Sequence, residues 1–283
     1  MQAEELERVN VLAAKIRRDV LEMLLPLGSG HLGGSMSIAD LMALLYGKEL
    51  AYDPENPRWE GRDRVVLSKG HAGPAWYAAL AESGFFDRDM LFTLNQAHTD
   101  LPSHPDRLKT PGVDMTTGSL GQGCSTAAGI AYANRLKGSD AYTYLIVGDG
   151  ELNEGQCWEA FQFIAHNRLN RCIVIIDDNK KQLDGYTKDV MNPFDIAEKM
   201  RAFGFATQRV NGQDVVALDA AITCAKHTED SAVAIVMDTV KGAGIPYFEQ
   251  LMSNHSVKFD AEATAAAEQA IAGFEAVIEG SRA

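Results

Sequence analysis

Two polar side chains near the middle of the chain are suited to hold a hard metal cation. Asp149 lies in a Gly-Asp-Gly motif directly after the apolar run 142–147, and Asn179 ends an Asp-Asp-Asn motif after the apolar run 172–176. Carboxylate and amide oxygens are ligands that Mg²⁺ and Ca²⁺ prefer. Mg²⁺ usually keeps few protein ligands and completes its octahedron with phosphate oxygens and water. The pair therefore predicts a cation that is shared with a bound diphosphate.

The two apolar runs explain how Asp149 and Asn179 come together. Each run is short, rich in Ile and Val, and without polar alternation, which is typical of strands buried on both faces of a parallel sheet. The segment between them has a helical period at Trp158, Phe161 and Ile164, so the stretch predicts a strand–helix–strand unit. Open α/β sheets bind ligands outside the carboxyl ends of their strands. We therefore expect both polar side chains in one crevice.

The glycines on either side of Asp149 have two interpretations. Gly148 and Gly150 let the backbone approach a ligand closely and aim N–H groups at an anion. Alternatively, the motif is a tight turn in which Asp149 caps the helix that follows. The second polar strand end, at Asn179, favours the ligand site.

The rest of the chain repeats this pattern of buried strands and helices. Further strands are expected at 64–68 and 232–238, and both lead into glycine-rich segments. Helices are expected over 3–25, from Ser37 with Asp40 completing a variant capping box, over 124–136, from Pro193, and from the turn at 210–214 to about 226. We predict an α/β protein with a single doubly wound domain over residues 1–283. It has a mostly parallel central sheet, helices on both faces and a C-terminal helical tail at about 260–280.

Four of the seven histidines lie in loops that could open on the same edge of the sheet: His31, His71, His104 and His255. A neutral imidazole both donates and accepts hydrogen bonds and titrates near physiological pH. It therefore suits hydrogen bonding to a diphosphate or proton exchange with sugar hydroxyls. Zinc binding is the rival interpretation, but no two histidines have the HxH or HxxxH spacing of a zinc site. We expect His98, His166 and His227 to be structural or surface residues.

Composition excludes several classes of protein. The net charge of −13 argues against nucleic acid or an anionic membrane surface as a partner. Four widely spaced cysteines without a CxxC motif indicate reduced, buried thiols. We see no signal peptide and no apolar run of the roughly 20 residues that a membrane-spanning helix needs. We therefore expect a cytoplasmic protein.

The motifs around Asp149 and Asn179 resemble those of one family. The string GDGELNEGQCWEA followed by DDNKKQLDG is similar to the thiamine diphosphate motif of transketolases, and SGHLG, LSKGHA, SHPD and GSLGQG resemble other loops of that family. The resemblance implies the thiamine diphosphate-binding fold, with thiamine diphosphate and Mg²⁺ as cofactors and Ca²⁺ as a possible substitute. It implies that Asp149, Asn179 and the main-chain carbonyl of Lys181 bind the metal.

The same resemblance implies roles for the other loop residues. His31, His104 and His255 are expected to contact the sugar and the reacting centre, and Glu154 to lie at a subunit boundary near a catalytic carboxylate of a partner. His71 is expected near the diphosphate, Gly118 and Leu120 at the aminopyrimidine through backbone groups, and Leu183 against the thiazolium ring. The cofactor-binding set is therefore His71, Gly118, Leu120, Gly148, Asp149, Gly150, Glu151, Asn179 and Leu183. The chain departs from the family at Leu32, where proline is usual, and at Ser256, where glycine commonly follows the histidine.

The resemblance extends from the first helix to about His255, whereas full-length transketolases continue well beyond this length. Their further part holds the pyrimidine-binding domain, its activating glutamate and basic residues that grip a sugar phosphate. We therefore expect the N-terminal subunit of a split transketolase that moves a two-carbon ketol unit between phosphorylated sugars. Its partner would be a separate C-terminal subunit, with two copies of each chain. The alternatives are a deoxyxylulose-phosphate synthase-like or oxo-acid dehydrogenase-like subunit, and a non-catalytic cofactor-binding chain.

Overall fold

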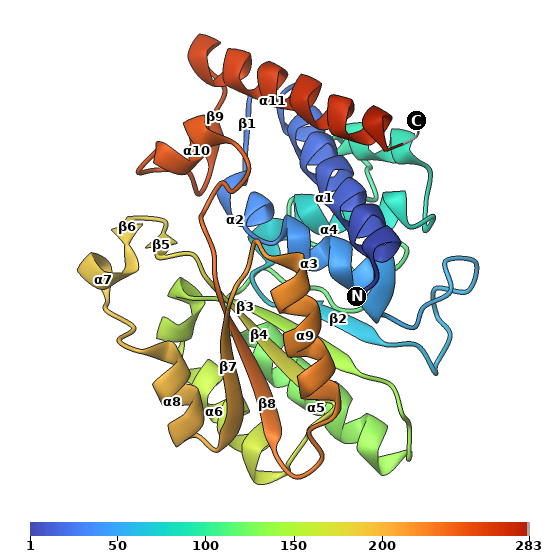
Figure 1. Ribbon diagram of the computed structural model, residues 1–283, viewed down its shortest axis with the longest axis vertical. Coiled ribbons are helices and arrows are strands. Elements are labelled where there is room, and N and C mark those ends of the chain that lie inside the picture. The colour runs from blue at the N-terminus through green and yellow to red at the C-terminus, as the bar shows by residue number, and fades with distance from the viewer. Residues whose placement is uncertain (282–283) are drawn as a thin grey trace.

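The computed structural model describes residues 1–281, and a five-stranded parallel sheet lies at its centre (Figure 1). The strand order is β2 (Arg64–Leu67), β3 (Thr143–Gly148), β4 (Cys172–Asp178), β8 (Ala232–Asp238) and β7 (Phe205–Asn211). Every neighbouring pair is parallel. Strands β3 and β4 are buried along their whole length, as their apolar runs predict. Gly148 pairs with Asp177, so the two motifs leave the sheet at the same edge.

Helices cover both faces of the sheet, which confirms the predicted α/β fold (Figure 1). Alternate residues of β4 point to opposite faces: Ile173 and Ile175 join one core, and Val174 and Ile176 join the other. The first core includes helices α1 (Ala3–Leu24), α3 (Ala39–Leu44), α4 (Gly73–Glu82) and α9 (Val215–Lys226). The second includes α5 (Gln122–Leu136), α6 (Gly155–His166) and α8 (Ile196–Ala202).

The two ends of the chain pack together on one side of the sheet. Helix α11 (Ala261–Gly280) corresponds to the expected helical tail and lies along α1 (Figure 1). Strand β1 (Ser29–Gly30) pairs antiparallel with β9 (Val257–Lys258). This pair holds the loop that follows β1 beside the loop that precedes β9. No helix within residues 1–281 is both long and apolar enough to cross a membrane.

The remaining elements are short. They are α2 (Gly33–Met36), a π-helical segment (Leu45–Glu49), three 3₁₀ turns (Gly70–Ala72, Arg88–Thr93 and Gly150–Asn153), α7 (Thr187–Val190), α10 (Pro246–Gln250) and the two-residue strands β5 (Lys181–Gln182) and β6 (Gly185–Tyr186). Strands β5 and β6 form a small hairpin directly after β4. Most of these elements lie in the loops between the larger helices and strands, where they shape the backbone around the carboxyl ends of the sheet.

The predicted helix start at Ser37 is wrong. Helix α2 ends at Met36, and α3 begins at Ala39 without a side-chain cap. The hydroxyl of Ser37 instead donates to the carbonyl of Gly34 and to the carboxylate of Asp177. Asp40 accepts two hydrogen bonds from Arg17, at 3.0 and 2.5 Å. Ser37 and Asp40 therefore bond to residues distant in the sequence instead of capping the start of a helix.

The expectation about the cysteines holds for three of the four. Cys124, Cys157 and Cys172 are buried free thiols, but Cys224 is exposed. Cys224 lies on α9, which buries its other face through Leu218, Ala221 and Ile222. The helical period thus turns Cys224 toward solvent.

Candidate active site

A cavity of about 410 Å³ opens at the carboxyl ends of β2, β3, β4 and β8. It contains every residue that the sequence singled out for metal, cofactor or substrate. These are His31, His71, His104, Gly118, Leu120, Gly148, Asp149, Gly150, Glu151, Glu154, Asn179, Lys181, Leu183 and His255. Residues from six separate loops thus meet in one place, as the rule for open α/β sheets predicts.

Asp149 is a buried carboxylate without a cationic side-chain partner in the described part of the chain. Its oxygens accept hydrogen bonds from the backbone N–H groups of Gly150 at 2.7 Å and Lys180 at 2.6 Å. Burial, followed by the negative charge of Asp177, raises the pKa of Asp149 to about 7. A divalent cation would stabilise the charged form of this carboxyl group. The site therefore fits a metal ion.

Asp177 organises the side chains behind the cavity wall. Its carboxylate accepts hydrogen bonds from four side chains: Lys69 (2.5 Å), Ser37 (2.8 Å), Asn179 (2.8 Å) and Thr239. Burial alone would raise the pKa of Asp177, but the charge of Lys69 and these hydrogen bonds hold it below its usual value. Because Nδ2 of Asn179 is engaged with Asp177, the amide is held in one orientation, and Oδ1 accepts from the N–H of Lys181 at 3.1 Å.

Replacing Asp177 by alanine is expected to lower the free energy of unfolding by roughly 3–5 kcal/mol, because it leaves the ammonium of Lys69 buried without its carboxylate. Both side chains are at most 1% exposed. Urea unfolding followed by circular dichroism measures the change. Asp189→Ala is the control, because Asp189 pairs with Lys188 on the surface, and such pairs contribute about 0–1 kcal/mol. Equal losses in the two variants would refute the role of the buried pair.

Two lysines in the cavity wall were not predicted from the sequence. Nζ of Lys241 donates to the carbonyl of Lys181 at 2.9 Å and lies 3.3 Å from Nδ1 of His255. Burial, followed by the charge of Lys69, lowers the pKa of Lys241 to about 8. Lys69 also donates to the carbonyl of Gly34 at 2.8 Å. Each lysine precedes a glycine just after a strand, so the strand-end rule that selected Asp149 could have found both.

Lys181 presents its backbone rather than its side chain to the cavity. Its Nζ donates to the carbonyls of Glu249 at 3.0 Å and Leu251 at 2.9 Å, while its own carbonyl accepts from Lys241. The side chain of Lys181 is thus occupied by two protein carbonyls, and the expectation that its main-chain carbonyl binds a metal stays a prediction.

The four loop histidines form one cluster at the mouth of the cavity. Ring centroids lie 4.4 Å apart for His71 and His255, 5.3 Å for His31 and His255, 5.6 Å for His31 and His104, and 5.9 Å for His31 and His71. Burial is the largest cause that lowers the pKa of each ring, and the pKa of His255 falls to about 3. The rings are therefore neutral at pH 7, so each offers one donor and one acceptor nitrogen.

Glycines and Glu151 shape the backbone around this cluster. Gly118 has φ of +149°, and a Cβ there would lie 3.2 Å from the ring of His104. The buried carboxylate of Glu151 accepts from the hydroxyl of Ser68 at 2.5 Å, from the N–H of Gly121 at 2.7 Å and from the N–H of Gly148 at 3.0 Å. Glu151 thus ties the loop that carries Gly118 to the end of β3 and supports the wall from behind.

Gly150 lies close against the hairpin that follows β4. A Cβ on Gly150 would lie 2.9 Å from the side chain of Gln182, so any larger residue would force the hairpin to move. Lys69 and Lys241 supply positive charge to the same cavity. At the rim, Leu183 is 62% exposed and Glu154 is also exposed. The site therefore combines a carboxylate for a cation, two ammonium groups for an anion and an apolar side chain at its edge.

Comparisons with known proteins agree with this geometry. Residues 9–278 match the family described as transketolase, thiamine diphosphate binding domain. The chain is 45% identical to the 6-deoxy-6-sulfo-D-fructose transketolase subunit SqwG of Clostridium sp. (strain MSTE9), over 87% of this chain and 90% of that protein. It is 37% identical to one subunit of the apulose-4-phosphate transketolase of Actinobacillus succinogenes, over 87% of this chain and 88% of that protein.

The fold also matches solved transketolases. The crystal structure of transketolase from Campylobacter jejuni superposes with a TM-score of 0.87 and 29% identity, over 99% of this chain and 47% of that one. The chain thus spans about half the length of that solved enzyme. The relatives named as subunits, in contrast, match over nearly their whole length.

Proposed function

The chain belongs to the transketolase family through its thiamine diphosphate-binding domain, and we propose that it is the N-terminal subunit of a split transketolase. It transfers a two-carbon ketol unit between phosphorylated sugars, in the cytoplasm, as a single folded domain. The observation that carries the proposal is the cavity in which Asp149, Asn179 and the carbonyl of Lys181 meet a cluster of four histidines. The subunit names of relatives that match over about nine-tenths of their length support it.

In this proposal Asp149, Asn179 and the carbonyl of Lys181 hold Mg²⁺, for which Ca²⁺ can substitute. The raised pKa of Asp149 supports this assignment, because a carboxylate that is costly to ionise alone is stabilised by a bound cation. Gly148 and Gly150 face the diphosphate, His71 lies beside it, and Lys69 and Lys241 balance its charge. Glu151 and Gly118 keep these loops in place.

Thiamine diphosphate supplies, when bound, the nucleophilic carbon that carries the two-carbon unit. Backbone groups of Gly118 and Leu120 orient its aminopyrimidine, and Leu183 packs against its thiazolium. Leu183 is largely exposed in the isolated chain, which is costly for a leucine that has no ligand or partner to cover it. A ring held against Leu183 would therefore gain apolar contact as well as exclude water.

His31, His104 and His255 contact the sugar in this proposal. Their neutral rings can accept a proton from a sugar hydroxyl and donate one back without first losing a charge. Glu154, at the exposed rim, lies at the boundary to a partner subunit and near its catalytic carboxylate. The partner is a C-terminal transketolase chain that supplies the phosphate-binding residues, and the assembly contains two copies of each chain with twofold symmetry.

The function is tested by mixing the chain with the C-terminal half from a neighbouring reading frame, thiamine diphosphate and Mg²⁺. Transfer of a ¹³C-labelled two-carbon unit from a ketose phosphate to an aldose phosphate is the expected result. A sulfonated ketose is tested in parallel, because the relative with 45% identity is named for one. If cofactor binds but neither donor yields an aldose extended by two carbons, ketol transfer is excluded. If cofactor does not bind, the thiamine assignment fails as well.

Alanine at His31 or His104 is expected to slow turnover of the reconstituted enzyme by roughly 10²–10⁴-fold, the usual range for loss of an acid–base group. Affinity for the cofactor should change little, because neither ring contacts Asp149 or Asn179. Steady-state kinetics and calorimetry measure the two effects separately. His166→Ala, on α6 outside the cavity, is the matched control. Unchanged turnover in both active-site variants would make these rings structural.

A further inference from the structure

The largest hollow among those described is a basic pocket at the other end of β2 from the candidate active site. It has a volume of about 660 Å³ and is lined by residues of three segments, 57–64, 107–115 and the outer side of α5. Five cations line it, Arg58, Arg62, Arg64, Arg107 and Lys109, against two acids, Glu60 and Asp114. This excess of positive charge is notable in a chain with a net charge of −13.

Most of this positive charge has no counter-ion. The side chains of Arg58, Arg107 and Lys109 are exposed and form no ion pair within residues 1–281. Glu60 lies 3.9 Å from Lys137, a surface residue that does not line the pocket. Asp114, with its side chain 6% exposed, already accepts from the N–H of Val65 at 2.9 Å and pairs with Arg62.

Arg62 and Arg64 bring two guanidinium groups to the lining of the basic pocket. Nε of Arg62 donates to the carbonyl of Pro57 at 2.6 Å, but its Nη1 is buried without a hydrogen-bond partner. Arg64 donates to the carbonyls of Arg62 at 3.2 Å and Glu60 at 3.1 Å. Burial, followed by the charge of Arg62, lowers the pKa of Arg64. An anion would supply the missing acceptor and remove the repulsion.

The loop that carries Arg107 and Lys109 is anchored rather than loose. The hydroxyl of Thr110 donates to the carbonyl of Asp100 at 2.5 Å, and this threonine is 2% exposed. Gly112 has φ of +83°, and a Cβ there would lie 2.5 Å from the side chain of Leu80. The two exposed cations are therefore presented from a fixed backbone.

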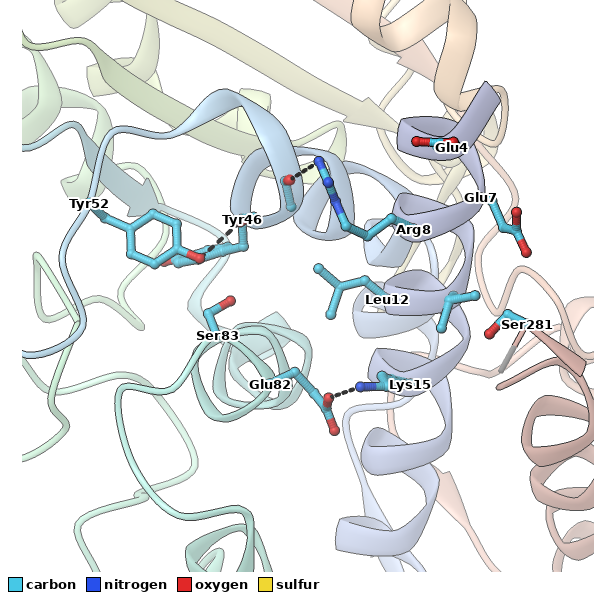
Figure 2. Close-up of a pocket in the computed structure, with 12 residues that line it drawn as sticks. Glu4, Glu7, Arg8, Leu12, Lys15, Tyr46, Tyr52, Glu82, Ser83 and Ser281 are labelled. Atoms are coloured by element: carbon cyan, nitrogen blue, oxygen red, sulfur yellow. Dashed lines mark hydrogen bonds and ion pairs between the residues drawn. The ribbon is translucent and has the colours of Figure 1, made fainter. Parts of the chain in front are cut away.

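A second large hollow differs from the basic pocket in the charges that line it. It lies between α1 and α4, has a volume of about 550 Å³ and is shown in Figure 2. Of its two cations, Lys15 pairs with Glu82 at 2.8 Å, and Arg8 donates to the carbonyl of Gly47 at 3.3 Å. Of these two hollows, the basic pocket alone combines unpaired cations with a buried donor that lacks an acceptor.

We propose that the basic pocket binds a small phosphorylated anion. Guanidinium groups bind phosphate oxygens two at a time, and a phosphate ester carries about −1.5 to −2 charge on three acceptor oxygens, so it suits a group of several cations better than a single carboxylate does. The volume is in the range of small-molecule sites. No aromatic side chain lines the pocket in the described structure, so nothing is offered for a base to stack on. The ligand class is therefore a phosphate ester or polyphosphate without a nucleobase. The proposal does not depend on ketol transfer.

Calorimetric titration with pyrophosphate, at about 0.15 M salt and with a chelator to remove divalent cations, tests this proposal. Arg107→Gln with Lys109→Gln removes two exposed cations that have no partners. Binding is expected to weaken by about 10- to 100-fold for each charge-assisted hydrogen bond that the variant can no longer form. The control, Lys188→Gln with Arg201→Gln, changes the net charge equally at a distance from the pocket and should bind as the wild type does.

A third variant separates the basic pocket from the candidate active site. Lys241→Met removes a cation from the cavity that holds Asp149, and one pyrophosphate should still bind. The proposal is overturned if Lys241→Met abolishes all binding, or if the pocket variant loses no more affinity than the control. It is also overturned if the wild-type chain binds no pyrophosphate. If, in that case, the pocket variant also fails to associate with the partner chain, the surface is assigned to a protein interface.

Discussion

Replacing Asp149 by alanine is expected to abolish joint binding of thiamine diphosphate and Mg²⁺. The buried carboxylate is held by two backbone N–H groups at the end of β3 and has no cationic side-chain partner in residues 1–281. A divalent cation would supply the missing positive charge and would leave coordination positions free for diphosphate oxygens and water. Without the carboxylate, one amide and one carbonyl oxygen remain, too few to hold Mg²⁺. Calorimetric titration of cofactor with and without Mg²⁺ measures the loss.

Asp178→Ala is the matched control for this experiment. Asp178 lies in the same motif as Asn179, but its carboxylate pairs with Arg209 at 2.9 Å and with Lys180. Both cations also pair with Asp238, so they keep a partner in the variant. Cofactor affinity should fall less in Asp178→Ala than in Asp149→Ala. Unchanged affinity in a folded Asp149→Ala protein would remove Asp149 from the metal site.

The purified chain alone is expected to show no ketol transfer, even with saturating cofactor and Mg²⁺. In the proposed function the cavity holds the groups that bind the metal, the diphosphate and the sugar hydroxyls, but not the carboxylate that activates the cofactor. The carboxylate that activates the cofactor is expected on the partner, beyond the exposed rim at Glu154. Leu183 at the same rim is 62% exposed, so a partner that closes over it would bury apolar surface.

Adding the C-terminal partner should restore turnover in proportion to the amount of complex formed. A coupled assay on the chain before and after addition measures this, with the partner alone as the second blank. Asp149→Ala mixed with the partner controls for host transketolase, because a contaminant would remain active. Turnover by the chain alone that survives further purification would show that it needs no second subunit.

The strands at the centre of the fold could be predicted because both their faces are apolar. The expected strand 232–238 coincides with β8, and the two central runs became β3 and β4. Strand β7 was missed because it lies at the edge of the sheet, where FATQRVN is half exposed and mostly polar. An edge strand depends on its pairing with β8 rather than on its own composition.

The candidate site could be predicted where its residues lie in short, recognisable sequence motifs. Asp149, His31, His71 and His104 stand in glycine- or proline-rich motifs, Asn179 and His255 stand in short polar motifs, and the structure brings all six into one cavity. The contact between Lys69 and Asp177 was not foreseen, because it joins the ends of β2 and β4, two strands separated by β3. No pattern of neighbouring residues in the sequence shows that these two strand ends lie close together. The failure at Ser37 has the same cause, since its partner is also Asp177.

Because β1 pairs with β9, the candidate active site can form only late in the synthesis of the chain. His31 follows β1 directly, and His255 precedes β9, so the two rings meet only when residues 257 and 258 have emerged. Helix α1 is made first, yet α11, which packs on it, is made after everything else that the site requires. The part of α1 that packs on α11 therefore stays uncovered until the end of synthesis, and a site that needs His31 beside His255 can form only after residue 258 has emerged.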